Sequence, residues 1–124
     1  MLKLLAIDDN RENLGLITAT LEDQSVEILT ASDAEVGFEM FLQFRPRIIL
    51  LDLVMPKVSG MELLERIVAV DQGVDVILMT AHYSTDSAVE AIQKGASDYL
   101  TKPIEVKNSA AASQNSFWKR RDAR

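Results

Sequence analysis

The stretch IILLD at residues 48–52 decides the fold, because four consecutive aliphatic residues run directly into a carboxylate. Strands buried on both faces have this continuous apolar pattern, whereas strands with one wet face alternate apolar and polar residues. Three further runs also end in polar residues: LLAI at 4–7 before Asp8 and Asp9, VILM at 76–79 before Thr80, and DYLT at 98–101 before Lys102. If all four are parallel strands, these polar groups meet at one edge of one sheet.

The chain alternates between two periodic patterns. Strand-like runs lie near residues 3–7, 26–30, 47–51, 74–79 and 98–101, and apolar residues at helical spacing lie near 11–22, 33–44, 60–70 and 86–94. Short strands alternating with helices imply right-handed crossovers and a parallel sheet. We therefore predict an α/β protein with a flavodoxin-like, doubly wound five-stranded parallel sheet, strand order 2-1-3-4-5, and helices on both faces.

Signals at the helix ends support this reading. Asn10 is a suitable N-cap for the first helix. Ser32 and Ser59 each precede a glutamate by three residues, which is the pattern of a capping box before the second and third helices. Gly95 stands where the fourth helix is expected to end, directly before the fifth strand.

The length of 124 residues suits one domain with its own core. We expect the core to occupy residues 1–106. Residues 107–124 are expected to form a fifth helix and a tail, or the start of a linker to an output domain. This segment lacks the large aliphatic residues of the other helices, so the fifth helix is predicted to pack loosely, with Phe117 or Trp118 as its anchor.

Composition narrows the function classes. The chain has no cysteine, which fits a reducing compartment, and we expect a cytoplasmic location. Its apolar runs are too short for a membrane span, so no membrane association is expected. A net charge of −6 argues against direct binding of nucleic acid by this domain.

The polar residues at the predicted edge suggest phosphoryl chemistry. Asp8, Asp9 and Asp52 would repel one another, and a hard divalent cation such as Mg²⁺ relieves that repulsion. Asp52 is either a metal ligand only or also a nucleophile that accepts a phosphoryl group. Lys102 supplies an ammonium and Thr80 a hydroxyl for phosphoryl oxygens. Taken singly, each has a plainer reading: Asp9 as a helix cap, Thr80 as a strand end and Lys102 as a solvated surface residue.

As an ordered set, these residues match a family pattern. The elements are Ile7-Asp8-Asp9, DLVMP at 52–56 with Gly60, Thr80-Ala81, and Asp98-Tyr99-Leu100 with Lys102-Pro103. The chain closely resembles the receiver domain of two-component response regulators over residues 3 to about 106. This resemblance implies a phosphorylation-dependent signalling switch that regulates an output such as transcription.

The resemblance also implies roles for individual residues. Asp52 is expected to accept a phosphoryl group from a sensor histidine kinase. Asp8, Asp9, Asp52 and the backbone carbonyl of Val54 are expected to bind Mg²⁺, directly or through water. Thr80 and Lys102 would then hold the phosphoryl group. The domain is expected to be a phosphoacceptor with slow autodephosphorylation, not a turnover enzyme.

Further implications concern the switch. Tyr99 is expected to change rotamer on activation, and the helix near 86–94 is expected to move, since Val89 and Ile92 are its only large apolar anchors. The surface formed by the fourth helix, fifth strand and fifth helix implies a homodimer contact. His82 is interpreted either as an exposed imidazole or as a group that controls access to the phosphoryl site.

Two other classes of function remain alternatives. The first is a protein interaction module that uses the same fold without phosphorylation, although the complete residue set argues against it. The second is a metal-dependent phosphohydrolase with an aspartate nucleophile. Such enzymes have an Asp-x-Asp pattern after the first strand. Here Asp8 and Asp9 are adjacent, and Asp52 follows the third strand.

Overall fold

The computed structural model describes residues 2–22 and 25–102, which form a three-layer α/β domain. The strands are β1 (Leu2–Ile7), β2 (Val26–Ala31), β3 (Ile48–Asp52), β4 (Asp75–Thr80) and β5 (Asp98–Thr101), and the helices are α1 (Arg11–Leu21), α2 (Ala34–Phe44), α3 (Gly60–Val70) and α4 (Thr85–Gln93). The prediction from periodicity is confirmed, because every boundary lies within one residue of the expected one.

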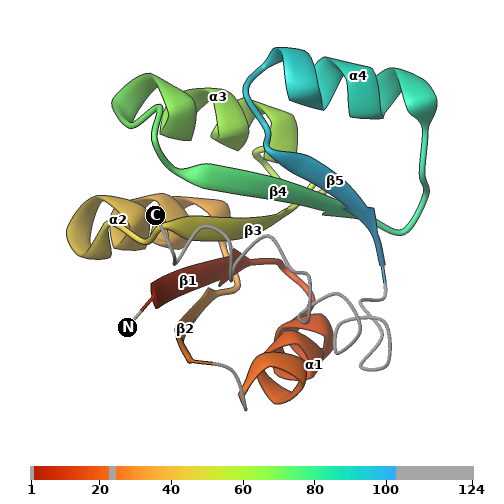
Figure 1. Cartoon of the computed structure of the whole chain (residues 1–124). Helices are drawn as coiled ribbons and strands as arrows, with labels where there is room; N and C mark the ends of the chain where they lie inside the picture. The colour runs from red at the N-terminus through yellow and green to blue at the C-terminus, as the bar shows by residue number, and fades with distance from the viewer. Residues whose placement is uncertain (1, 23–24, 103–124) are drawn as a thin grey trace.

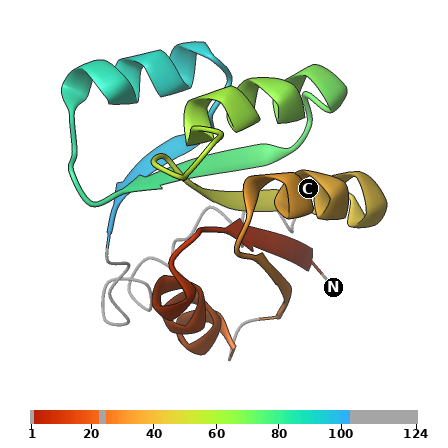
Figure 2. The same ribbon diagram turned by 180° about the vertical axis from the view of Figure 1, so that it is seen from behind.

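All strand pairs are parallel, and their order is β2-β1-β3-β4-β5. This is the predicted doubly wound order, with its reversal at β1 and β3. Helices α2, α3 and α4 cover one face of the sheet and α1 lies on the other (Figure 1), as the view from behind confirms (Figure 2). The predicted arrangement of helices on both faces is therefore correct.

Successive residues of each central strand enter different cores. Leu5 and Ile7 of β1 join Phe41 of α2 and Leu64 of α3 in the core between the sheet and these helices. The alternate residues of the same strands face α1 in a second core, whose members include Leu4, Ala6, Ile17, Leu50, Ile77 and Met79. Because both faces are covered, the central strands are apolar throughout, and only their ends carry polar groups.

Two of the three predicted caps are confirmed. The side chain of Asn10 accepts a hydrogen bond from the backbone of α1, and the hydroxyl of Ser59 does the same for α3. Ser32 is not the cap of α2, so that prediction is wrong. Asp33 takes the position, and its carboxylate accepts bonds from two backbone N–H groups, which a serine hydroxyl one residue earlier does not reach.

Helix α4 ends as predicted but packs differently. Gly95 has a φ of 109°, and the next N–H bonds back to the carbonyl of Ala91, which closes the helix in a Schellman-type turn. The expected anchors Val89 and Ile92 are about half exposed, and Ala91 is instead the buried residue of α4. With one buried alanine and the partly buried Ala88 as its contacts with the core, α4 is weakly held, which suits an element that shifts.

The predicted fifth helix, with Phe117 and Trp118, lies outside the described residues. Within residues 2–22 and 25–102, the helices are too short and too polar for any of them to span a bilayer.

The start of α3 is tightly packed against β3. A Cβ atom at Gly60 would meet the backbone carbonyl oxygen of Asp52 and the Cα of Leu53. The N–H of Gly60 also donates to the carbonyl of Leu53 at 2.7 Å. Only glycine allows this approach, so Gly60 fixes the path of the chain that leaves the acidic edge.

We expect Gly60→Ala to destabilise the fold by about 3 kcal/mol or more, because backbone atoms cannot yield as side chains do. Gly15→Ala is the matched control. Gly15 is exposed in α1 with no atom near its would-be Cβ, so alanine should stabilise by about 0.5–1 kcal/mol. Urea unfolding measures both, and equal effects at the two sites would contradict the packing argument.

Candidate phosphoryl and metal site

The polar site lies where the strands end. Asp8 directly follows β1, Asp52 and Thr80 are the last residues of β3 and β4, and Lys102 directly follows β5. A hollow of about 290 Å³ opens at this edge and is lined by Asp9, Asn10, Asp52, Val54, Thr80, Ala81, His82 and Lys102. The structure thus brings together the residues predicted from four separate strands.

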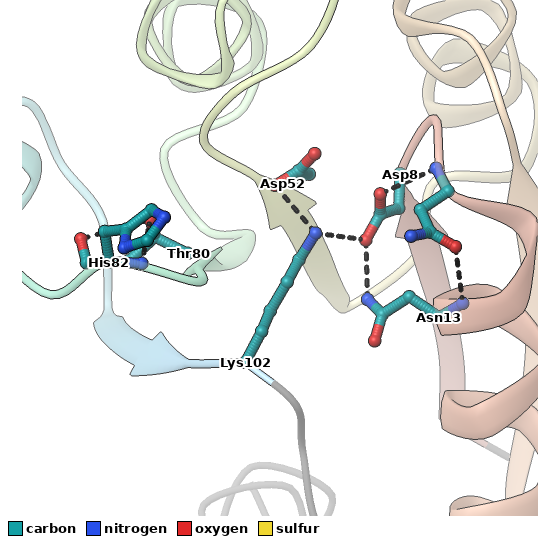
Figure 3. A network of polar contacts seen from close by, with 7 residues as sticks. Asp8, Asn13, Asp52, Thr80, His82 and Lys102 are labelled. Atoms are coloured by element: carbon teal, nitrogen blue, oxygen red, sulfur yellow. Dashed lines mark hydrogen bonds and ion pairs between the residues drawn. The ribbon is translucent and has the colours of Figure 1, made fainter.

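Lys102 links two of the carboxylates. Its Nζ lies 2.8 Å from Oδ2 of Asp8 and 3.0 Å from Oδ1 of Asp52 (Figure 3). Both carboxylates are buried, and the lysine side chain is largely buried as well. Ion pairs removed from water interact more strongly than surface pairs, so this bridge sets the geometry of the site.

Asp8 is held from several directions. Its Oδ1 accepts the backbone N–H of Asn10 at 2.9 Å, and its Oδ2 accepts the side-chain amide of Asn13 in addition to Lys102. Asp8 is fully buried, and an ionised buried carboxylate requires such donors. The consecutive aspartates therefore differ, because Asp9 is exposed at the mouth of the hollow.

The electrostatics of Asp52 suit a reactive carboxylate. Burial raises its pKa to about 6, and the charge of Asp8 and a contact with Asp9 act in the same direction, against the opposing effect of Lys102. Burial alone would lower the pKa of Lys102, but its bonds to Asp8 and Asp52 outweigh burial and raise it. At neutral pH the lysine is charged, and Asp52 is mostly ionised.

The three aspartates fit a hard divalent cation. One carboxylate oxygen from each of Asp8, Asp9 and Asp52 lies within 4.8 Å of the others. Three carboxylates and Lys102 carry a formal charge of −3 + 1 = −2, which one divalent cation neutralises. Mg²⁺ binds one or two carboxylates together with waters and phosphate oxygens. The donor set therefore fits Mg²⁺.

Thr80, His82 and Val54 surround the opening of this hollow. The hydroxyl of Thr80 accepts the N–H of His82 at 3.2 Å and is 3.3 Å from the carbonyl of the same residue. The side chains of His82 and Val54 are exposed, with Val54 72% accessible. Both residues line the hollow beside Asp52.

Tyr99 lies in β5 next to this site but is not part of its lining. Its side chain is buried, with 8% exposed, and its ring packs edge to face against Tyr83 at 5.4 Å between centroids. Its hydroxyl is buried and has no hydrogen-bond partner among the described residues. A buried hydroxyl without a partner is unfavourable, although burial of the ring itself is not.

Two residues near the site, Asn13 and Tyr83, were not predicted from the sequence. A signal for Asn13 was present, because residues 13, 17 and 21 form one row of α1 and the other two are the buried Ile17 and Leu21. A polar residue in a buried row requires a buried partner, and that partner is Asp8. For Tyr83, no pattern in the chain indicated contact with Tyr99.

The fold and this edge define a receiver-type α/β domain, with a doubly wound sheet that ends in an acidic cluster and a bridging lysine. The chain belongs to the response regulator receiver domain family, whose sequence model it matches over residues 4–113. Receiver domains are phosphoacceptors of two-component systems and act with sensor histidine kinases.

Individual relatives agree. The chain is 35% identical to the chemotaxis protein CheY of Listeria monocytogenes, covering 86% of this chain and 90% of that protein. It is 33% identical to the transcriptional regulatory protein DltR of Streptococcus agalactiae, covering 85% of this chain but 47% of DltR. The crystal structure of a receiver domain protein from Clostridium thermocellum matches with a TM-score of 0.85 and 32% identity over 100% of both chains.

The raised pKa of Asp52 predicts a pH-dependent penalty in metal-free buffer. The carboxyl has a pKa of about 6 in the folded chain and about 3.9 when unfolded, so the folded state binds more protons between these values. The contribution of Asp52 to stability therefore falls as pH rises from about 4 to about 6.

Asp52→Asn should remove this penalty and stabilise the metal-free chain by about 1–2 kcal/mol at pH 7.5, after allowance for solvent screening. At pH 4 the difference should shrink toward zero. Urea unfolding at both pH values measures the difference in the free energy of unfolding between the two proteins. If the wild type became more stable relative to Asp52→Asn as the pH rises, the prediction would be wrong.

Proposed function

We propose that this domain is a phosphorylation switch in which Asp52 accepts a phosphoryl group from the phosphohistidine of a sensor kinase. The observation that carries the proposal is the bridge from Lys102 to Asp8 and Asp52, beside a third carboxylate at the sheet edge. In this proposal Asp8, Asp9, Asp52 and the carbonyl of Val54 hold Mg²⁺, which neutralises charge on the phosphoryl oxygens.

The proposed phosphoryl transfer needs no reactant besides the phosphohistidine donor and Asp52. A carboxylate oxygen of Asp52 forms a bond to phosphorus as the phosphorus–nitrogen bond of the donor breaks, and the leaving imidazole takes up a proton. The ammonium of Lys102 donates a hydrogen bond to a phosphoryl oxygen, and the hydroxyl of Thr80 at the end of β4 donates another. The domain is then a phosphoacceptor with slow self-catalysed hydrolysis, and His82 and Val54 limit the access of water.

The proposed response uses the weakly held side of the domain. A dianionic group on Asp52 draws Lys102 and the Thr80 hydroxyl toward it, and the backbone N–H of Lys102 already donates to the carbonyl of Thr80 at 2.6 Å. Movement of Thr80 changes the space available to Tyr99, and α4 adjusts because only the small Ala88 and Ala91 pack it against the core. Tyr99 and α4 together form the two-state element.

We propose a cytoplasmic role in a two-component system whose output is transcription, as the name of the relative DltR suggests. The half-exposed Val89 and Ile92 of α4, beside β5, offer apolar surface for a homodimer or an output partner. A phosphorylation-independent interaction module is the alternative, and the intact set of Asp52, Thr80 and Lys102 disfavours it.

Tyr99→Phe should stabilise the unphosphorylated domain by about 1 kcal/mol, because it removes a buried hydroxyl that has no partner. Tyr83→Phe is the matched control, since the hydroxyl of that exposed ring can be solvated, and its effect should stay within about 0.5 kcal/mol. Urea unfolding measures both variants. A destabilised Tyr99→Phe would mean that the hydroxyl is hydrogen-bonded in solution.

Incubation with acetyl phosphate and Mg²⁺, read by intact mass, should add one phosphoryl group to the wild type. The gain should disappear in Asp52→Asn, which lacks the nucleophilic oxygen, and should fall strongly when the metal is chelated. Asp71→Asn is the matched control, because Asp71 lies at the end of α3 remote from the site and should leave the gain unchanged.

Beryllofluoride separates the alternatives. It should raise the unfolding temperature of a receiver in the presence of Mg²⁺ and leave an interaction module unmoved. Rapid release of phosphate from small esters would instead favour a phosphohydrolase. No mass gain under conditions that modify a known receiver would overturn the proposed function.

A further inference from the structure

Asn13 contacts the centre of the site from the first turn of α1. Its side chain is buried, and its Nδ2 donates to Oδ2 of Asp8, the same oxygen that Lys102 contacts at 2.8 Å (Figure 3). We infer that Asn13 is a positioning residue that fixes the Asp8 carboxylate for metal binding and keeps it hydrogen-bonded when Lys102 turns toward a phosphoryl group. This inference rests on the proposed function.

Lys102 is shared between two acids. Lys102 bridges Asp8 and Asp52, so any new negative charge on Asp52 competes with Asp8 for the ammonium. Without another donor, Oδ2 of the fully buried Asp8 would lose its partner as Lys102 moves, and only Oδ1 would keep one, the N–H of Asn10; a buried carboxylate oxygen without a donor is unfavourable. The Asn13 amide is a donor that does not depend on the position of Lys102.

The side chain of Asn13 is uncharged. A neutral amide donates to the carboxylate without cancelling the negative charge that attracts a cation. A lysine or arginine at residue 13 would hold Asp8 equally well but would reduce the formal charge of −2 that the three carboxylates and Lys102 present. Donors that orient metal-binding carboxylates commonly matter for affinity although they never touch the metal.

The start of α1 holds Asn13 and Asp8 in a fixed arrangement. The side chain of Asn10 caps α1 by accepting the backbone N–H of Asn13 at 3.1 Å, and the backbone N–H of Asn10 donates to Oδ1 of Asp8 at 2.9 Å. The two asparagines therefore hold both oxygens of Asp8, one through the backbone and one through the side chain. The same cap that starts α1 also sets the orientation of Asn13 toward Asp8.

A Mg²⁺ titration followed by backbone amide chemical shifts tests the inference on the whole chain. Asn13→Leu keeps the branched shape and the number of side-chain heavy atoms, suits the apolar row of Ile17 and Leu21, and removes the donor. We expect its dissociation constant for Mg²⁺ to rise about tenfold, as for other groups that orient metal ligands. Asn13→Ala, which removes the donor and the volume together, should show the same loss.

Thr18→Val is the matched control. Thr18 is a polar residue of α1 whose hydroxyl bonds the carbonyl of Leu14 in its own helix at 2.9 Å, so valine should leave the Mg²⁺ affinity unchanged. Urea unfolding of each variant in metal-free buffer separates folding from affinity. A merely structural Asn13 would change stability and leave the dissociation constant at the wild-type value.

The outcomes are distinguishable. If the wild type binds Mg²⁺ and Asn13→Leu and Asn13→Ala bind it equally well, the positioning role is overturned and the proposed switch stands. If the wild type itself binds no Mg²⁺ and gains no phosphoryl mass, the proposed function fails and the inference fails with it. Weaker binding in both variants, with Thr18→Val unchanged, supports the inference.

Discussion

The bridge of Lys102 between Asp8 and Asp52 is the interaction on which this edge of the domain depends. The parallel sheet places the carboxyl ends of β1, β3 and β5 together, so it gathers acids that would repel one another in a poorly solvated hollow. The lysine offsets part of that repulsion, and the raised pKa of Asp52 reflects the part that remains. Without a cation the site therefore keeps uncompensated negative charge, which suits chemistry that requires a bound cation.

The same bridge connects charge to shape. Lys102 directly follows β5, the strand that carries Tyr99, and its backbone N–H bonds to the carbonyl of Thr80 at the end of β4. In the proposed switch, a change of charge at Asp52 would therefore act on the ends of β4 and β5, the second of which carries Tyr99. In the proposed switch the response involves α4, because Ala91 is the one buried residue of this helix, whereas α3 buries Leu63, Leu64 and Ile67.

The fold and most of the site follow from sequence because their signals are local and repeated. Five apolar runs and four helical patterns set the sheet, and the polar residues at the ends of four of these runs place Asp8, Asp52, Thr80 and Lys102 at one edge. The errors arose where local signals compete or where packing decides. Ser32 and Asp33 both suit an N-cap, and only the backbone path selects Asp33. Val89 and Ile92 are apolar, but the rotation of α4 turns the small Ala91 inward instead.

Asn13 illustrates why a binding site extends beyond the residues that a motif contains. A buried carboxylate shared with a lysine that has to move needs a second donor that stays in place, and a neutral one if the cluster is also to attract a cation. The first turn of α1 is the element that directly follows Asp8, and its buried row leads from residue 13 straight into the core. An amide at that position meets all three requirements: it reaches the acid, it carries no charge and it is fixed by the helix. The helix cap and the acidic site thus share the same residues, so a substitution in one alters the geometry of the other.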